Sequence, residues 1–344
     1  MLKKKDRYMV TVVGATGAVG RELVELLDER GFPLEGLVPL ASEESEGERI
    51  DCNNKAWIVR RLSEDAFKGV DIAFFFAGEG PSRKYAPLAV EAGVVVIDAS
   101  AAFRMDPNVP LVVPDVNPRA LARHAGVISI PCPSAAGMVS ILKPIHDAAR
   151  IRRVVATVFQ SVSGDGKKAM DELADQTVAL LNFKETPPCV YPHQIAFNCI
   201  PRVGDFSANG CSGEGLNIAN ETKKIFEDDS IRVTATSVII PVFRCHSVVL
   251  NIEMERKTSA NEVRALLSAE PGIVVYDDPS RNIYPMPLDA AGRDDIYVGC
   301  IREDDTVTCG ISLWMVYDNL RRAVALNAVQ IAEGLINETG LIPR

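Results

Sequence analysis

A glycine-rich turn directly after an apolar run is the feature that most constrains the fold of this chain. The run Tyr8–Val13 is short and rich in β-branched residues, as is typical of a buried parallel strand. It leads into Gly14-Ala15-Thr16-Gly17-Ala18-Val19-Gly20, and Arg21–Leu27 follows with helical periodicity. Glycines at such a turn allow close backbone approach to a pyrophosphate, which the N–H groups at the helix start can bind. Similar turns also occur without a ligand. The turn predicts a dinucleotide site, or one descended from it, with these candidate contacts: Gly14, Thr16, Gly17, Ala18 and Val19.

The first third of the chain alternates strand-like and helical segments. Further strand candidates are Leu37–Leu40, Val70–Phe76 and Val94–Ile97, and helical stretches such as Tyr85–Glu91 separate them. Alternation of this kind predicts βαβ units. We therefore expect an α/β fold, with a doubly wound, parallel Rossmann-type sheet over residues 1–130.

The pattern changes near Pro131. A helix is expected from about Ser134, and more widely spaced strand-like runs follow it: Arg153–Phe159, Ile231–Ile240, Ser247–Glu255, Tyr297–Ile301 and Val307–Tyr317. They predict a second, α+β domain over residues 131–318 with a largely antiparallel sheet. The stretch Asn319–Ile336 has the periodicity of an amphipathic helix. We expect this final segment, 319–340, to pack back on the first domain.

Composition excludes several classes of function. With 344 residues, two domains are the default expectation. A formal net charge of -9 without a large basic block argues against nucleic-acid or anionic-membrane partners. No apolar run has the length of a signal peptide or a membrane span. The eight cysteines are scattered without metal-ligand spacing, so we expect a cytoplasmic protein with reduced thiols and no structural metal.

Several longer motifs resemble one known family. They follow the family order along the chain: Val95–Asp98 with Ala102–Asp106, Val112–Asn117, Gln160–Gly166, Gln194–Asn198, Asn220–Lys224, Pro241–Ser247, and Asp318–Arg321 with Ala325–Ala328. Together with the glycine-rich turn they resemble the aspartate-semialdehyde dehydrogenases. That resemblance implies an NADP- or NAD-dependent oxidoreductase that interconverts an acyl phosphate and an aldehyde through a thioacyl enzyme. It also implies a homodimer formed through the second domain, which apolar runs such as Val233–Ile240 and Val248–Ile252 would suit.

The resemblance assigns roles to particular side chains. His246 matches the family's catalytic histidine, and Gln160 matches the glutamine that orients the substrate. Arg104 matches the arginine that binds the substrate phosphate. Gly78 and Asn319 are further candidate cofactor contacts.

The position of the nucleophile is open between two registers. Alignment through Met138 and the downstream helix places Pro133 on the family's cysteine position, whereas placing Cys132 there requires a deletion upstream and an insertion after it. A thiol at a helix N-terminus has a lowered pKa, which favours Cys132 as a nucleophile. One residue of displacement, however, rotates a side chain by about 100° near a helix start. The other reading of Cys132 is a small buried thiol.

Four further positions depart from the family pattern. Glu44 stands where an arginine binds the 2′-phosphate of NADP, so NAD, or no cofactor, is favoured over NADP. Ile239 replaces the arginine for the substrate carboxylate, Asn217 a lysine, and Ala99 an asparagine. These changes resemble the Usg-like paralogues. The alternatives to an ordinary family enzyme are therefore a non-catalytic binding protein and an enzyme whose acyl substrate lacks the amino-acid carboxylate.

Overall fold

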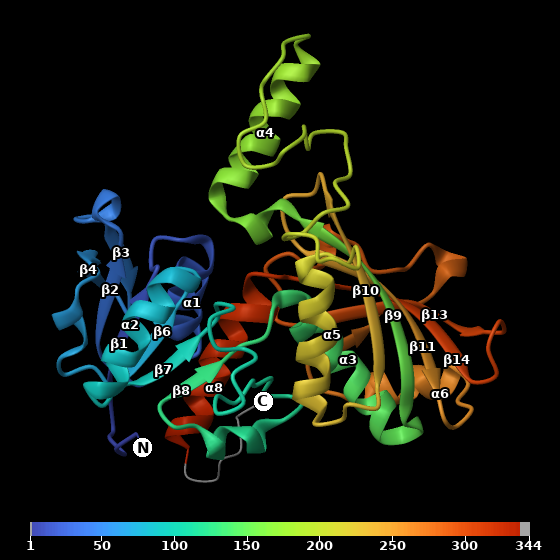
Figure 1. Ribbon diagram of the computed structural model, residues 1–344, viewed down its shortest axis with the longest axis horizontal. Helices are drawn as coiled ribbons and strands as arrows, with labels where there is room; N and C mark the ends of the chain where they lie inside the picture. The colour runs from blue at the N-terminus through green and yellow to red at the C-terminus, as the bar shows by residue number, and fades with distance from the viewer. Residues whose placement is uncertain (1, 338–344) are drawn as a thin grey trace. The chain divides into compact units, whose positions relative to one another are not determined.

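The structure is a computed structural model that describes residues 2–337 (Figure 1). The chain divides into two compact units. The first contains the residues up to Cys132 and those from Val324 onward, and the second is Pro133–Ala323. No helix in the described part of the chain has the length and apolarity to cross a membrane.

The first unit is built on a six-stranded sheet in the order β5-β2-β1-β6-β7-β8. The pairings along this order are all parallel, which confirms the expected fold class. The strands in that order are β5 (Arg60–Arg61), β2 (Leu34–Ala41), β1 (Tyr8–Val13), β6 (Ile72–Phe75), β7 (Val95–Asp98) and β8 (Val127–Ser129). Residues of β6 and β7 are buried at every position, because a parallel sheet of this type is covered on both faces.

Helices cover both faces of this sheet. Successive side chains of a strand point to opposite faces. Accordingly, Phe74 of β6 packs in the same cluster as residues of α1 (Ala18–Glu29) and α8 (Asn327–Ile336). Its neighbour Phe75 packs in a second cluster with residues of α2 (Glu79–Glu91). A bidentate ion pair of 2.7 Å between Arg30 and Glu333 joins the end of α1 to α8.

The last helix begins later than the sequence pattern predicts. Arg321–Leu326 form a π-helical turn, and α8 follows from Asn327. Before the turn, the Asp318 carboxylate accepts the N–H groups of Leu320 and Arg321 at 3.0 Å. Because a side chain takes these N–H groups, regular helix does not start at Asn319. Residues 338–340 of the expected segment lie outside the described residues.

Short elements complete the first unit. A two-stranded antiparallel sheet is formed by β3 (Arg49–Cys52) and β4 (Lys55–Ile58). The 3-10 turns are η1 (Glu43–Ser45), η2 (Glu64–Phe67) and η3 (Pro118–Arg123).

The second unit is built on a mixed six-stranded sheet in the order β10-β9-β11-β14-β13-β12. The inner pairings are antiparallel, as expected, whereas the two edge pairings, β10 with β9 and β12 with β13, are parallel. The strands are β9 (Ile151–Ser161), β10 (Arg232–Ile240), β11 (His246–Met254), β12 (Ile273–Val275), β13 (Ile296–Asp304) and β14 (Gly310–Tyr317).

Three helices pack on the sheet of the second unit, namely α3 (Pro133–Ala149), α5 (Gly213–Phe226) and α6 (Ala260–Ser268). Along β9, Val154, Ala156 and Val158 are buried, while the alternate residues are partly exposed. Helix α4 (Lys167–Leu181) extends away from the sheet of its own unit (Figure 1). The remaining elements are η4 (Val162–Asp165), η5 (Pro279–Arg281) and α7 (Pro287–Ala290).

Candidate active site

The glycine-rich turn of the first unit leaves no room for side chains at two positions. Gly14 has a φ of +89°, and a Cβ there would lie 2.9 Å from the Phe76 backbone carbon. A Cβ at Gly20 would lie 2.2 Å from the Gly14 carbonyl oxygen. Gly17 is the N-cap of α1. The backbone N–H groups of Ala18 and Val19, in the first turn, therefore have no hydrogen-bond acceptor within the helix. This backbone cradle at a helix N-terminus fits the pyrophosphate of a dinucleotide.

The loops that follow β2 and β6 place polar and acidic side chains at the same edge of the sheet as the glycine-rich turn. Thr16 Oγ1 lies 3.3 Å from Ser45 Oγ, in the 3-10 turn after β2. Glu44 is exposed in the same turn, and its neighbour Glu43 pairs with Arg61 at 3.1 Å. Gly78 caps α2 after β6 with a φ of +86°. In doubly wound folds, dinucleotides bind at the carboxyl ends of the strands, which is where these residues lie.

Arg104 is buried and holds two backbone carbonyls of its own unit. Its Nε donates to Ile130 O at 3.0 Å, and a terminal nitrogen donates to Ala99 O at 2.6 Å. The nearby Asp98 accepts hydroxyl groups from Ser82 and Ser100 at 2.6 and 2.8 Å. Burial raises the pKa of Asp98, and these hydrogen bonds and Arg104 oppose the rise. Arg104 therefore braces the loop after β7, a structural role that the sequence did not predict for it.

Pro133, rather than Cys132, is the first residue of α3. Proline suits the first helical position, since its fixed φ is helical and its missing N–H would have no partner there. Cys132 immediately precedes the helix and is 1% exposed. Cys132 therefore lies directly before the helix, and the choice between the two registers stays a prediction.

Gln160 belongs to a buried polar cluster in the second unit. Its Nε2 donates to Ser134 Oγ and to Glu214 Oε1, both at 2.9 Å. Ser134 Oγ also donates to Glu214 Oε1 at 2.7 Å. No sequence motif indicates Glu214; its one signal is that of an acidic residue in the first turn of α5, two residues after the Ser212 cap.

Ile239 is paired in register with Gln160 in the neighbouring parallel strand. It is 4% exposed and packs in an apolar cluster with Val162, Tyr191 and Ile195. Two backbone hydrogen bonds of 2.9 Å tie it to Ile200. Position 239 thus lies beside Gln160 in the sheet but contributes apolar surface and no charge.

His246 begins β11 and is 1% exposed. Its Nδ1 accepts the backbone N–H of Ser161 at 3.2 Å, and Ser161 Oγ lies 3.3 Å from the same atom. The Tyr317 ring lies edge-on at 6.1 Å. Burial lowers the pKa of His246 to about 4, although the Asp318 carboxylate acts in the opposite direction. The ring is therefore neutral at pH 7.

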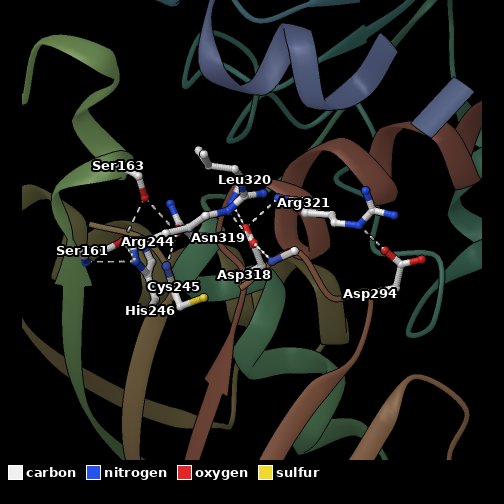
Figure 2. A network of polar contacts seen from close by, with 11 residues as sticks. Ser161, Ser163, Arg244, Cys245, His246, Asp294, Asp318, Asn319, Leu320 and Arg321 are labelled. Carbon is white, nitrogen blue, oxygen red and sulfur yellow. Dashed lines mark hydrogen bonds and ion pairs between the residues drawn. The ribbon is translucent and has the colours of Figure 1, made fainter. Parts of the chain in front are cut away.

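Asn319 connects the residues around His246 (Figure 2). Its Oδ1 accepts the backbone N–H of Cys245 at 3.0 Å and the hydroxyl groups of Ser161 and Ser163 at 3.2 and 3.1 Å. Its Nδ2 is buried and has no hydrogen-bond partner within the described part of the chain. A buried amide donor of this kind fits a ligand oxygen, in keeping with the cofactor contact that the sequence predicts for Asn319.

The carboxylate of Asp318 forms further hydrogen bonds next to Asn319. It is fully buried and accepts Arg244 Nε at 2.5 Å and the Gly292 N–H at 2.7 Å. Arg321 forms a further ion pair with Asp294 at 2.6 Å (Figure 2). These charged hydrogen bonds join segments far apart in the sequence, so the backbone on either side of His246 is held firmly.

The predicted site residues divide between the two units. The second unit brings Gln160 together with Ser134 and Glu214, and His246 together with Asn319. The glycine-rich turn, Gly78, Arg104 and Cys132 belong to the first unit. Among residues 2–337 no group of three or more His, Cys, Asp or Glu side chains could hold a metal ion.

Comparison with known proteins assigns both units to semialdehyde dehydrogenases. Residues 9–124 match the semialdehyde dehydrogenase NAD binding domain, and residues 142–322 match the semialdehyde dehydrogenase dimerisation domain. An aspartate-semialdehyde dehydrogenase of Aquifex aeolicus is 48% identical over 97% of this chain and 99% of its own length. One from Bacillus subtilis is 42% identical over 95% and 96% of the two chains.

A solved structure agrees closely with this one. The crystal structure of aspartate semialdehyde dehydrogenase II complexed with ASA from Vibrio cholerae has a TM-score of 0.95 at 44% identity. The match covers 97% of this chain and 99% of that one. The chain belongs to the aspartate-semialdehyde dehydrogenase family of oxidoreductases. These comparisons support the oxidoreductase interpretation rather than a non-catalytic, Usg-like paralogue.

Proposed function

We propose that this protein interconverts an acyl phosphate and an aldehyde as aspartate-semialdehyde dehydrogenases do, with aspartate semialdehyde as its first candidate substrate. The observation that carries the proposal is the buried framework that holds a neutral His246 through Ser161 and Asn319. Such a framework fixes a catalytic ring in one orientation, as positioned acid–base and hydrogen-bonding groups require.

Each role follows from the chemistry of the side chain. Cys132 supplies the thiol that attacks the carbonyl carbon, since no other reacting cysteine is suggested by the motifs. Gln160 orients the substrate, and its amide is itself fixed by Ser134 and Glu214. Arg104 contributes positive charge for the phosphate. A bound nicotinamide would exchange the hydride, and the glycine-rich turn would hold its pyrophosphate.

We expect NAD to be the preferred cofactor rather than NADP. Glu44 is exposed in the turn after β2, where the family uses an arginine for the 2′-phosphate, and a carboxylate there repels a phosphate but can accept a ribose hydroxyl. Calorimetric titration should therefore give a tighter Kd for NAD, and Glu44→Arg should shift the preference toward NADP. Glu46→Arg, a charge reversal nearby, is the matched control. Tight NADP binding by the unmodified protein would contradict this cofactor assignment.

A second candidate substrate is an acyl compound without the amino-acid carboxylate. The buried apolar Ile239, in register with Gln160, favours it. Loss of a bidentate carboxylate anchor typically costs a hundredfold or more in binding.

The test is turnover with a matched pair of histidine variants. Phosphate-dependent oxidation of aspartate semialdehyde and of an aldehyde without the carboxylate is followed with NAD and with NADP. His246→Ala should lower kcat by about 10²–10³, whereas His193→Ala, on an exposed loop, should not. No turnover of either aldehyde, or equal activity of the two variants, would reject the proposal.

A homodimer and a cytoplasmic location belong to the same proposal. We define the open face of the second sheet by six of its partly exposed residues: Val155, Thr157, Phe159, Val249, Asn251 and Trp314. Because strand residues alternate, Val249 lies on this face, whereas its neighbours Val248 and Leu250 are buried in the unit itself. Only part of each apolar run singled out in the sequence is thus available to a second copy. All eight cysteines are free thiols, which suits a reducing compartment.

A further inference from the structure

The outer edge of β10 is paired at one residue and open at the next position that faces the same way. β10 is the first strand of its sheet, so only β9 lies beside it. On its other side, Ile239 exchanges two backbone hydrogen bonds of 2.9 Å with Ile200 in an isolated antiparallel bridge. The residues of a strand direct their N–H and C=O groups alternately to either side, so Ser237 and Ala235 present theirs to the same outer edge as Ile239.

The chain that follows Ile200 leaves this edge before it reaches Ser237. In a continued antiparallel ladder, Arg202 would be the partner of Ser237. Arg202 instead forms an ion pair with Asp205 at 2.7 Å, and the loop turns toward the start of α5, where the Gly213 N–H donates to Asp205 O at 2.8 Å. Among the described residues, the outward N–H and C=O of Ser237 have no backbone partner.

A cavity of about 360 Å³ lies along this unpaired stretch. It is lined by Thr234–Ser237 of β10 and by Pro201, Phe206 and residues 209–212 of the loop. Ser237 is 1% exposed, and its Oγ is buried without a hydrogen-bond partner within residues 2–337. Buried polar groups are nearly always paired, so a residue with three unpaired polar groups beside a cavity indicates a site that a ligand completes.

The lining determines the chemistry of that ligand. None of the described residues that line the cavity is charged, which favours a neutral ligand. The N–H and C=O of Ser237 point the same way, as those of Ile239 do toward Ile200, and the main chain of an extended peptide presents the matching acceptor and donor. The ends of a free peptide carry charges, whereas the main chain of an internal segment carries none.

We propose that this cavity binds an extended, uncharged internal segment of a partner protein, which adds to the edge of β10 in line with Ile200. Strand addition of this kind takes its affinity from main-chain hydrogen bonds, and the cavity has room for only a few residues. None of the residues that line the cavity has a role in the proposed reaction. The binding site is therefore independent of the proposed function, and a failure of one leaves the other standing.

Binding of a blocked tripeptide to the full chain tests the proposal. The probe is acetyl-Thr-Val-Thr-amide, whose residues favour extended structure and whose ends are uncharged. In ¹H–¹⁵N spectra the amide signal of Ser237 should shift saturably, and concentrations up to about 10 mM cover a Kd of roughly 1 mM. The same tripeptide with free ends should bind more weakly, and an analogue methylated on its backbone nitrogens should not bind. The absence of a saturable shift would overturn the proposal, as would equal binding of the methylated or the free-ended peptide.

Two phenylalanine substitutions locate the site. Cys211 lines the cavity, whereas Cys199 is exposed and does not line it. Cys211→Phe should raise the Kd of the blocked tripeptide at least about tenfold, because the ring occupies the space that the peptide needs. Cys199→Phe is the matched control and should leave the Kd unchanged. Unchanged binding by Cys211→Phe would place the peptide elsewhere and overturn the proposal. If Cys211→Phe does not fold, the comparison of the blocked tripeptide with its methylated analogue decides.

Discussion

At the scale of single residues, the thiol of Cys132 is protected by the fold. It is 1% exposed, whereas Cys189 and Cys199 lie on exposed loops. The sequence predicts an activated thiol beside the helix start, but a reagent must first reach the sulfur. Exposure therefore predicts that Cys189 and Cys199 react first, whereas activation predicts that Cys132 reacts first.

We expect iodoacetamide to modify Cys189 and Cys199 before Cys132. Peptide mass spectrometry over a time course measures the order, and Cys132→Ser identifies the relevant peptide. If Cys132 reacts first, the thiol is both activated and accessible in solution, which would strengthen its assignment as the nucleophile.

His246 also determines a pH dependence of stability. Its pKa is about 4 in the folded protein and near the ordinary 6.5 when unfolded, so the unfolded chain binds the extra proton between these values. Stability therefore falls as the pH drops from 6.5 toward 4, by up to about 3 kcal/mol from this residue. Urea unfolding at pH 7 and 4.5 should show a smaller pH effect in His246→Gln than in the parent. An identical pH effect in both proteins would contradict the buried, neutral histidine.

At the scale of elements, the glycines of the strand-to-helix turn can be tested against a glycine with free space. Gly20→Ala would bring a Cβ to 2.2 Å from the Gly14 carbonyl oxygen. Because this oxygen is a backbone atom, relieving the clash requires a shift of the main chain. Gly80, in α2, has no atom within 4 Å of a Cβ and no positive φ. Alanine is also the better helix former by about 1 kcal/mol.

Gly20→Ala should accordingly destabilise the protein by more than about 2 kcal/mol, in the range typical of overpacking, while Gly80→Ala should be neutral or stabilising. Chemical denaturation measures both differences. A tolerated Gly20→Ala would mean that the turn is looser than the close packing of α1 on β1 implies.

At the scale of the whole molecule, association through the open face of the second sheet is the main expectation. Val249 lies between Thr157 and Trp314 in the strand register, and Phe159 stacks 5.9 Å from Trp314. A charge at the centre of this partly exposed apolar face would have to be buried unpaired in a dimer.

Sedimentation equilibrium should therefore give about twice the chain mass of 37.3 kDa for the parent and the single-chain mass for Val249→Glu. Ile58→Glu, an exposed apolar position of the first unit, is the control and should remain dimeric. A dimeric Val249→Glu would show that copies associate elsewhere.

The sequence by itself determined the parallel first sheet, the glycine-rich turn and the antiparallel centre of the second sheet. Their signals are local: β-branched runs such as Tyr8–Val13, glycines between strand and helix, and alternating burial. Motifs whose members are adjacent in the chain also made Gln160, His246 and Asn319 candidate site residues.

Only the tertiary structure decided which side chains meet. Glu214 joins Ser134 and Gln160 across long sequence separations, and Arg104 is occupied by backbone carbonyls of loops that follow different strands. The start of α3 at Pro133 and the π-helical turn before α8 depend on which groups form hydrogen bonds with the free backbone N–H and C=O groups at the helix ends. The backbone N–H that donates to His246 Nδ1 belongs to Ser161, 85 residues earlier. Such contacts leave no periodic signal in a sequence, because they arise only when separate strands and helices are brought together by burial of the core.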